Sequence, residues 1–248
     1  MKTWRINRIL ACPEALRLFK SLDDLFSLTG ELVNKSDLSD LLLVRTSTQA
    51  YYVKRYYKAG KKLRRIIGTS RLRGEWKNLQ RFAAWGIKSA PLIGHGRERT
   101  CLIFQRGALI TEALGETTDL AKTARIHPEF FQNREQVEIV SRKVAAYTRT
   151  MHDHGFAHGD LKWRNILVCR NQPEHVYLID CPDGRFWIWP FLQYRKNKDL
   201  ACLDKVGKTV LTRTQRLRFF LYYLEKDRLD KKTKNQIKKL IRFFDGEI

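Results

Sequence analysis

The fold is decided by the stretch His158-Gly159-Asp160-Leu161-Lys162-Trp163-Arg164-Asn165, followed shortly by Tyr177-Leu178-Ile179-Asp180. Asp160 and Asn165 lie five residues apart on one predicted loop, and Asp180 ends the short apolar run after it. Side chains on loops at the ends of short strands can converge, so we expect two carboxylates and one amide to meet. Such oxygen-rich sets suit Mg²⁺, which completes its shell with water and phosphate oxygens. A carboxylate that is not bound to metal can orient a hydroxyl and accept its proton.

Apolar periodicity predicts the elements on both sides of this stretch. A helix precedes it, with apolar residues spaced 3, 4, 3 and 4 and a stop at Gly155. The apolar positions of this helix are Val137, Val140, Val144, Tyr147 and Met151. A hairpin follows, with strands at 166–169 and 176–179, and the chain from Asp199 onward is predicted to be largely helical.

The first third of the chain indicates strands and loops. Runs at 40–45 and 50–55, separated by polar residues, predict an antiparallel hairpin. Leu72, Trp76, Leu79 and Ala83 share one face of a predicted helix that Gly86 ends, and residues 101–105 and 109–114 are predicted to form two further strands. A strand-rich part followed by a helix-rich part, with the change near residue 114, predicts two lobes.

Composition excludes several classes of protein. The 248 residues are 43% hydrophobic with 14 Gly and 6 Pro, which excludes a disordered or collagenous chain. No apolar run approaches the length of a membrane span, and the charged N-terminus does not resemble a secretory signal, so we expect a cytosolic protein.

The net charge is extreme, at +22. Residues 54–81 carry eleven Lys or Arg and one acid, and residues 205–242 carry thirteen against three acids. Such charge is either a solubilising surface or a sign of an anionic partner, and two dense blocks favour the partner.

The 158–165 stretch resembles the catalytic loop of kinases, H-x-D-L-x-x-x-N, and Asp180 occupies the place of the metal-binding Asp that follows it. Upstream, Tyr51-Tyr52-Val53-Lys54 resembles the strand that carries the ATP-binding Lys, and Glu75 stands 21 residues later, where the partner of that Lys is expected. Glu112-Ala113-Leu114 falls where the hinge between kinase lobes should lie.

A closer resemblance is to the lipopolysaccharide core sugar kinases of Gram-negative bacteria, the heptose and Kdo kinases. It rests on the Lys/Arg-rich stretch after Lys54, the helix at 73–79 and a Gly-x-x-x-x-Pro-x-x-x-Gly-like element at 86–96, and it covers about residues 40–205. It implies an α+β, bilobal protein-kinase-like fold. The N-lobe, 1–113, would hold a small antiparallel sheet and bind ATP, and the C-lobe, 114–248, would be mainly helical and hold the catalytic loop and metal site.

The resemblance also implies roles on the nucleotide side. Lys54 would contact the α- and β-phosphates of ATP, with Glu75 holding it in place. Glu112 and Leu114 would bind the nucleotide at the hinge.

On the transfer side, the resemblance implies that Asp160 orients the acceptor hydroxyl or takes its proton and that Lys162 neutralises the γ-phosphate. Asn165 and Asp180 would hold Mg²⁺, with Asp183 as an alternative or additional ligand. These groups and the Lys54–Glu75 pair are expected to surround one ATP in the crevice between the lobes.

The sequence departs from protein kinases in ways that bear on the acceptor. No G-x-G-x-x-G precedes Lys54, and the one candidate for covering the phosphates, 34–40, lacks Gly. The chain has no Ala-Pro-Glu, and only eighteen residues separate Asp180 from Asp199, too few for a peptide-binding platform. This spacing favours a small or lipid-linked acceptor. Asp199 is expected to brace the 158–165 loop through backbone hydrogen bonds.

Residues 185–196 interleave aromatic side chains with cations. That pattern is typical of a membrane interface and, with the basic blocks, predicts contact with an anionic membrane. The alternative interpretation is that Trp187, Trp189 and Phe191 pack beneath the segment that follows Asp180.

The sequence therefore predicts an ATP- and Mg²⁺-dependent kinase acting on the lipopolysaccharide core or its lipid-linked precursor, at the cytoplasmic face of the inner membrane. A heptose hydroxyl is the favoured acceptor. The alternatives are a Kdo kinase, a small atypical Ser/Thr protein kinase, and a non-catalytic basic pseudokinase that binds lipid or RNA. No zinc-finger spacing or RNP motif supports a nucleic-acid partner, and the histidines at 152, 154 and 158 fit a loop entry better than a zinc site.

Overall fold

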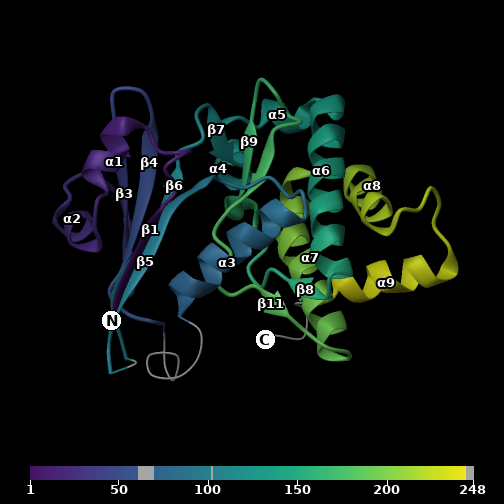
Figure 1. Ribbon diagram of the computed structural model, residues 1–248. Helices are drawn as coiled ribbons and strands as arrows, with labels where there is room; N and C mark the ends of the chain where they lie inside the picture. Colours follow the sequence, from purple (N-terminus) through teal and green to yellow (C-terminus); the bar gives the residue numbers. More distant parts are fainter. Residues whose placement is uncertain (61–69, 102, 244–248) are drawn as a thin grey trace. The chain divides into compact units, whose positions relative to one another are not determined.

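The computed structural model describes residues 1–60, 70–101 and 103–243, which form two compact units (Figure 1). The first contains Met1–Ala84 and Ser89–Gly115, and the second contains Trp85–Lys88 and Glu116–Ile248. Part of the first basic block, at 61–69, lies outside the described residues, as does residue 102 of the predicted strand 101–105.

The first unit is built on a six-stranded antiparallel sheet with the order β1-β5-β6-β4-β3-β2. The strands are β1 (Lys2–Ile6), β2 (Glu31–Lys35), β3 (Ser39–Arg45), β4 (Ala50–Tyr56), β5 (Leu92–Thr100) and β6 (Ile103–Glu112). The predicted hairpin at 40–55 is confirmed as β3 and β4, with Leu42 opposite Val53.

Helices cover both faces of this sheet. Side chains alternate along β4, so Tyr51 and Val53 face the short helices α1 (Pro13–Leu18) and α2 (Leu22–Ser27). Tyr56 faces the other side and packs against Leu72 and Leu79 of α3 (Arg71–Ala84), the predicted central helix. Lys54 shares the face of Tyr56, and the strand period therefore directs it toward α3.

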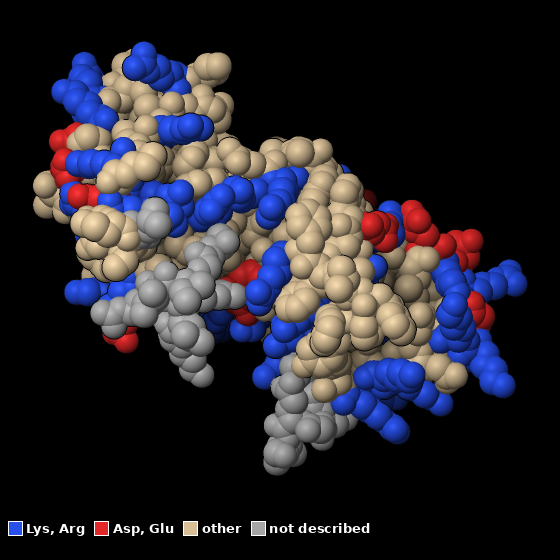
Figure 2. Space-filling model, turned by 60° about the horizontal axis from the view of Figure 1, so that its bottom comes forward, with Lys and Arg blue, Asp and Glu red and all other residues tan. Residues whose placement is uncertain are grey.

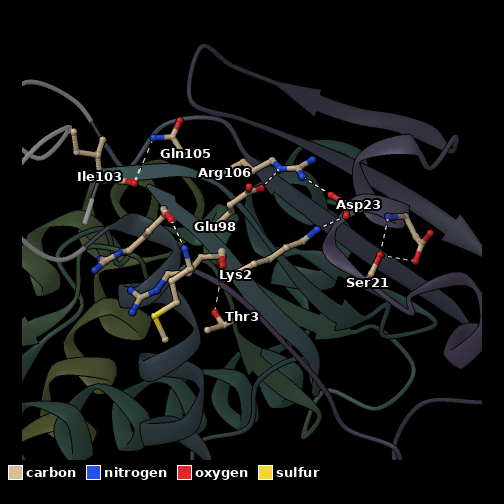
Figure 3. Close-up of polar contacts among 12 residues, drawn as sticks. Lys2, Thr3, Ser21, Asp23, Glu98, Ile103, Gln105 and Arg106 are labelled. Carbon is tan, nitrogen blue, oxygen red and sulfur yellow. Dashed lines mark hydrogen bonds and ion pairs between the residues drawn. The ribbon is translucent and has the colours of Figure 1, made fainter. Parts of the chain in front are cut away.

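The expectation of strands and loops in the first third of the chain was incomplete, because the helices α1 and α2 lie between β1 and β2. Each has only six residues, too few to show a helical period, and each is capped by a short side chain, Cys12 or Ser21. Asp23 of α2 pairs with Lys2 of β1 and with Arg106 of β6 (Figure 3). These contacts tie α2 to two strands of the sheet.

The two strands predicted at 101–105 and 109–114 are one strand, β6. Gly107 lies between the two predicted segments, inside the strand. A Cβ at this position would stand 2.3 Å from Leu72 Cδ2 and 2.7 Å from the carbonyl oxygen of Gly96. The glycine therefore allows α3 and β5 to approach closely rather than ending the strand.

A buried ion pair fastens α2 to the sheet. Arg55 of β4 donates from Nε and Nη2 to the Asp40 carboxylate, at 2.9 and 2.6 Å. Its Nη1 donates to the carbonyl oxygens of Leu25, Phe26 and Leu28 at 3.2–3.4 Å, at the end of α2. The two charged side chains are only 13% and 6% exposed, so water can replace little of this interaction.

Arg55→Met should therefore lower the free energy of unfolding by about 3 kcal/mol or more, because it leaves the Asp40 carboxylate buried without its cation. Urea unfolding followed by circular dichroism measures this loss. Arg45→Met is the matched control, since Arg45 pairs with Glu31 on the surface of the same sheet. Equal losses in both variants would contradict the prediction.

The second unit is mainly helical (Figure 1). Its helices are α4 (Leu120–Ile126), α5 (Glu129–Gln132), α6 (Arg134–Asp153), α7 (Phe191–Val210), α8 (Arg213–Leu224) and α9 (Lys231–Ile241). The predicted helix ending at Gly155 is confirmed as α6, and Gly155 has a φ of +70°. Among the described residues, no helix is long and apolar enough to cross a bilayer.

Short strands carry the loops of this unit. The predicted second hairpin is confirmed as β9 (Ile166–Cys169) and β10 (Val176–Leu178), with β7 (Thr117–Asp119) on the other side of β9. A second pair joins β8 (Phe156–Ala157) to β11 (Arg185–Phe186). The 158–165 loop begins directly after β8 and ends in a 3-10 turn at Trp163–Asn165.

Candidate active site

In the first unit, Lys54 and Glu75 form the ion pair that the sequence led us to expect. Lys54 Nζ lies 3.1 and 3.0 Å from the two carboxylate oxygens of Glu75, and the side chains are 20% and 7% exposed. β4 presents Lys54 on its α3 face, and Glu75 lies in the first part of α3. Strand and helix packing thus hold an ammonium group at a fixed place in the first unit.

Tyr56 completes this cluster, and the sequence analysis did not identify it. Its hydroxyl donates to Oε2 of Glu75, and its ring lies 5.6 Å from Lys54 Nζ. Tyr56 is 1% exposed. The sequence could have indicated Tyr56, because residues 54 and 56 of one strand place their side chains on the same face.

The predicted hinge residues lie at the end of β6 and just beyond it. Glu112 is the last residue of the strand, and its backbone N–H donates to the carbonyl oxygen of Pro91 at 3.0 Å. Leu114 follows after Ala113, whose N–H donates to the carbonyl oxygen of Ala50 at 2.8 Å. The segment 34–40 contains the end of β2, the turn after it and the start of β3. The nucleotide-binding roles of these residues stay predictions.

In the second unit, Asp199 of α7 braces the 158–165 loop. Its carboxylate accepts hydrogen bonds from the backbone N–H of His158 at 2.7 Å and of Gly159 at 2.9 Å. Asp199 is 1% exposed, and His152 of α6 lies 3.4 Å from it. The expected brace is confirmed, and it fixes the backbone directly before Asp160.

Two cations flank Asp160. Lys162 Nζ lies 2.5 Å from Oδ1, and Arg164 Nη2 lies 3.1 Å from Oδ2. Burial by itself raises the pKa of Asp160, but the ion pairs outweigh burial and hold the pKa below its usual range. The carboxylate is therefore ionised at neutral pH and can accept a hydrogen bond. Arg164 was not among the predicted site residues. Its position four residues after Asp160 is the feature of the sequence that could have indicated this ion pair.

Asn165 and Asp180 lie at neighbouring points of the backbone. The N–H of Ile179 donates to the carbonyl oxygen of Asn165 at 3.0 Å, which brings the end of β10 to the end of the loop. Asn165 is 3% exposed, and its Nδ2 donates to the carbonyl oxygen of Asp160 at 2.8 Å. Because Nδ2 is the donor of this hydrogen bond, Oδ1 is the amide atom that could bind a cation. An amide oxygen and a carboxylate are donors that fit Mg²⁺ with water and phosphate oxygens.

The turn that holds Asp180 packs tightly against the loop. Asp180 has a φ of +55°, a left-handed conformation that costs free energy in a residue other than glycine and often marks functional sites. A Cβ on Gly184 would stand 2.4 Å from Cys181 Sγ and 2.5 Å from Phe156 Cζ, so the turn has no room for a larger residue there. The metal-binding roles of Asp180 and Asp183 stay predictions.

The histidines at the end of α6 make hydrogen bonds within the second unit. His152 Nδ1 lies 2.8 Å from the Tyr223 hydroxyl, and His154 Nδ1 lies 2.8 Å from the carbonyl oxygen of Thr150. Among the described residues, no group of three or more His, Cys, Asp or Glu side chains could hold a metal ion. The triplet Gly-Lys-Thr at 207–209, which resembles the end of a P-loop, lies inside α7 and forms no phosphate-binding loop.

Comparison with known proteins identifies the family and the fold of the chain. The model of the lipopolysaccharide kinase (Kdo/WaaP) family matches residues 33–223, which include all eight predicted site residues. A solved structure of WaaP in complex with acyl carrier protein is similar with a TM-score of 0.74 and 19% identity, covering 99% of this chain and 97% of that one. A structure of vaccinia related kinase 3 is similar with a TM-score of 0.50 and 13% identity, covering 86% and 79%.

At these identities the two structures establish the fold, which is α+β and protein-kinase-like as predicted. The family match spans most of the chain and agrees with the resemblance noted in the sequence. The chain belongs to the lipopolysaccharide kinase (Kdo/WaaP) family.

Proposed function

We propose that this chain, a phosphotransferase that acts on a sugar hydroxyl, transfers the γ-phosphoryl group of Mg-ATP to a heptose of the lipopolysaccharide inner core. The observation that carries the proposal is the family match across the 158–165 loop, in which Asp160 is ionised and Asp199 holds the backbone at His158 and Gly159. The link from Asp180 to Asp199 supports a sugar acceptor. It contains β11 and the start of α7, which leaves no length for a peptide platform.

The residues of the second unit would carry the transfer. Asp160 would accept a hydrogen bond from the acceptor hydroxyl and then its proton as the oxygen attacks phosphorus. Lys162 would balance the charge of the γ-phosphate, and Asn165 and Asp180 would hold Mg²⁺. When bound, this ion supplies positive charge to the phosphate oxygens.

In the first unit, Lys54 would bind the α- and β-phosphates of ATP, with Glu75 and Tyr56 fixing the position of its ammonium group. Glu112 and Leu114 would contact the base. Phosphoryl transfer needs positioning and charge stabilisation more than covalent chemistry. Charged and amide side chains of these types are therefore sufficient for the reaction.

The proposed location is the cytoplasm, with peripheral contact at the inner membrane, because the acceptor is the lipopolysaccharide core or a lipid-linked precursor of it. The use of ATP as phosphoryl donor is consistent with the cytoplasmic side of the membrane.

The test is a kinase assay with purified protein, Mg-ATP and core lipopolysaccharide, followed by mass spectrometry of the product. We expect one added phosphoryl group on a heptose. Phosphate on Kdo instead of heptose would show that Kdo, the alternative acceptor, is the substrate. Phosphate on Ser or Thr of the protein without glycolipid would favour a protein kinase. No rise in melting temperature with Mg-ATP would favour a non-catalytic scaffold.

A further inference from the structure

Apolar side chains are displayed to solvent between β11 and α7. Ile188 is 77% exposed, Trp189 is 82% exposed and Phe191, at the start of α7, is 61% exposed. Packing beneath a neighbouring segment, the alternative interpretation of these aromatic residues, therefore does not apply to Trp189 or Phe191. Contiguous exposed apolar residues of this size mark a binding surface.

Trp187 has a different role from Trp189. Its ring is half-buried between two guanidinium groups, those of Arg185 at 4.6 Å and Arg195 at 4.2 Å. Its backbone N–H donates to the carbonyl oxygen of Gly155 at 2.9 Å. Trp187 thus anchors the segment and holds two cations beside the exposed apolar side chains.

Helix α9 brings further cations to the same part of the second unit. Its apolar positions Leu240 and Ile237 pack into the core cluster that contains Leu200 of α7, and the ring of Phe243 lies 5.2 Å from that of Tyr194. The remaining surface of residues 231–242 carries no acid and six cations: Lys231, Lys232, Lys234, Lys238, Lys239 and Arg242. Figure 2 shows Lys and Arg side chains crowded where α9 lies, with uncharged surface beside them.

We propose that Ile188, Trp189, Phe191 and the cations of α9 form a docking surface for an anionic phospholipid bilayer. We call it the membrane-docking surface. Apolar and aromatic side chains enter the headgroup region, and the surrounding cations pair with lipid phosphates. The inference rests on the proposed function only in taking the acceptor to be a membrane glycolipid. It adds α9, which lies beyond residue 223, where the family match ends.

The membrane-docking surface and the 158–165 loop extend from opposite ends of the antiparallel β8–β11 pair. β11, which precedes Ile188, pairs with β8, and Arg185 stands opposite Ala157, the residue before His158. Docking through Trp189 would therefore fix the orientation of the 158–165 loop relative to the bilayer through this strand pair.

The test is co-sedimentation of the full chain with vesicles of phosphatidylcholine, alone or mixed with phosphatidylglycerol, in the absence of ATP. We expect binding to the anionic vesicles that weakens with salt. The double variant Ile188→Ser, Trp189→Ser should weaken this binding on the order of tenfold or more. Lys238→Gln with Lys239→Gln should weaken it by about fivefold for each charge removed. A blue shift of tryptophan emission on binding should disappear in Trp189→Phe.

Matched controls change similar side chains elsewhere. Ile9→Ser removes an apolar side chain that is 93% exposed, and Lys122→Gln with Arg125→Gln removes two cations of α4. Binding that is equal in all variants, or that ignores the anionic lipid, would overturn the proposal. Retained phosphorylation of a delipidated core oligosaccharide by the docking variants would support it. Vesicle binding by a protein without kinase activity would refute the proposed function and leave the surface in place.

Discussion

Asp160→Asn is expected to lower the rate of phosphoryl transfer by about 10²–10⁴-fold while Mg-ATP still binds. The amide matches the carboxylate in shape, so the acceptor hydroxyl can still be positioned. It cannot take the hydroxyl proton, and it leaves Lys162 and Arg164 without their anion. Single-turnover kinetics with core lipopolysaccharide measure the transfer, and a thermal shift with Mg-ATP measures binding.

Two comparisons make this result specific. Asp153→Asn removes an exposed carboxylate at the end of α6 and should leave transfer unchanged. In the wild type, the pKa of Asp160 is depressed, so Asp160 should stay ionised at any pH well above about 4. The rate of transfer should therefore not fall through protonation of Asp160 in that range. Lys162→Met removes one lowering contact, so the pKa of Asp160 should rise and the acid limb should move to higher pH. Undiminished transfer by Asp160→Asn would remove Asp160 from the mechanism.

Periodicity predicted the elements whose burial repeats along several turns or residues. The helix α6 spans 20 residues with a buried stripe, and β3 and β4 alternate buried and exposed side chains, so each carries its own signal. The six-residue helices α1 and α2 carry none. The two strands predicted at 101–105 and 109–114 are one strand, and the close approach of α3 that requires Gly107 inside it is a tertiary contact that the local sequence does not show.

The site residues were chosen by motif, which identifies side chains but not their neighbours. The motif indicated Asp160, Asn165 and Asp180, and nothing local to them indicated the left-handed backbone of Asp180. The brace from Asp199 comes from a residue about 40 positions further along the chain and was expected only through the resemblance to kinases. Tyr56 joins Glu75 only because β4 and α3 pack together, a tertiary contact that no motif encodes.

Lys54→Met should lower kcat/KM for ATP by about 10²–10³-fold, the loss typical when one charge-stabilising group is removed. The ammonium group lies 3.0 Å from Glu75 and 5.6 Å from the Tyr56 ring, so the protein holds a cation in place before any phosphate arrives. Steady-state kinetics at varied ATP concentration measure the loss. Arg45→Met, which removes an exposed cation of β3 on the same sheet, is the matched control.

The structural cost of Lys54→Met has to be separated from the loss of phosphate contact, because the variant leaves the nearly buried Glu75 carboxylate without a cation. Lys54→Arg keeps the charge but replaces a compact ammonium with a planar fork, so it should stay folded and still lose most of the rate. Tyr56→Phe keeps the ring and loses only the hydroxyl that donates to Glu75, so it should raise KM for ATP by less than either Lys54 variant, with little change in melting temperature. Wild-type kinetics in Lys54→Arg would show that any cation at this position suffices and that the geometry set by Glu75 and Tyr56 does not matter for the reaction.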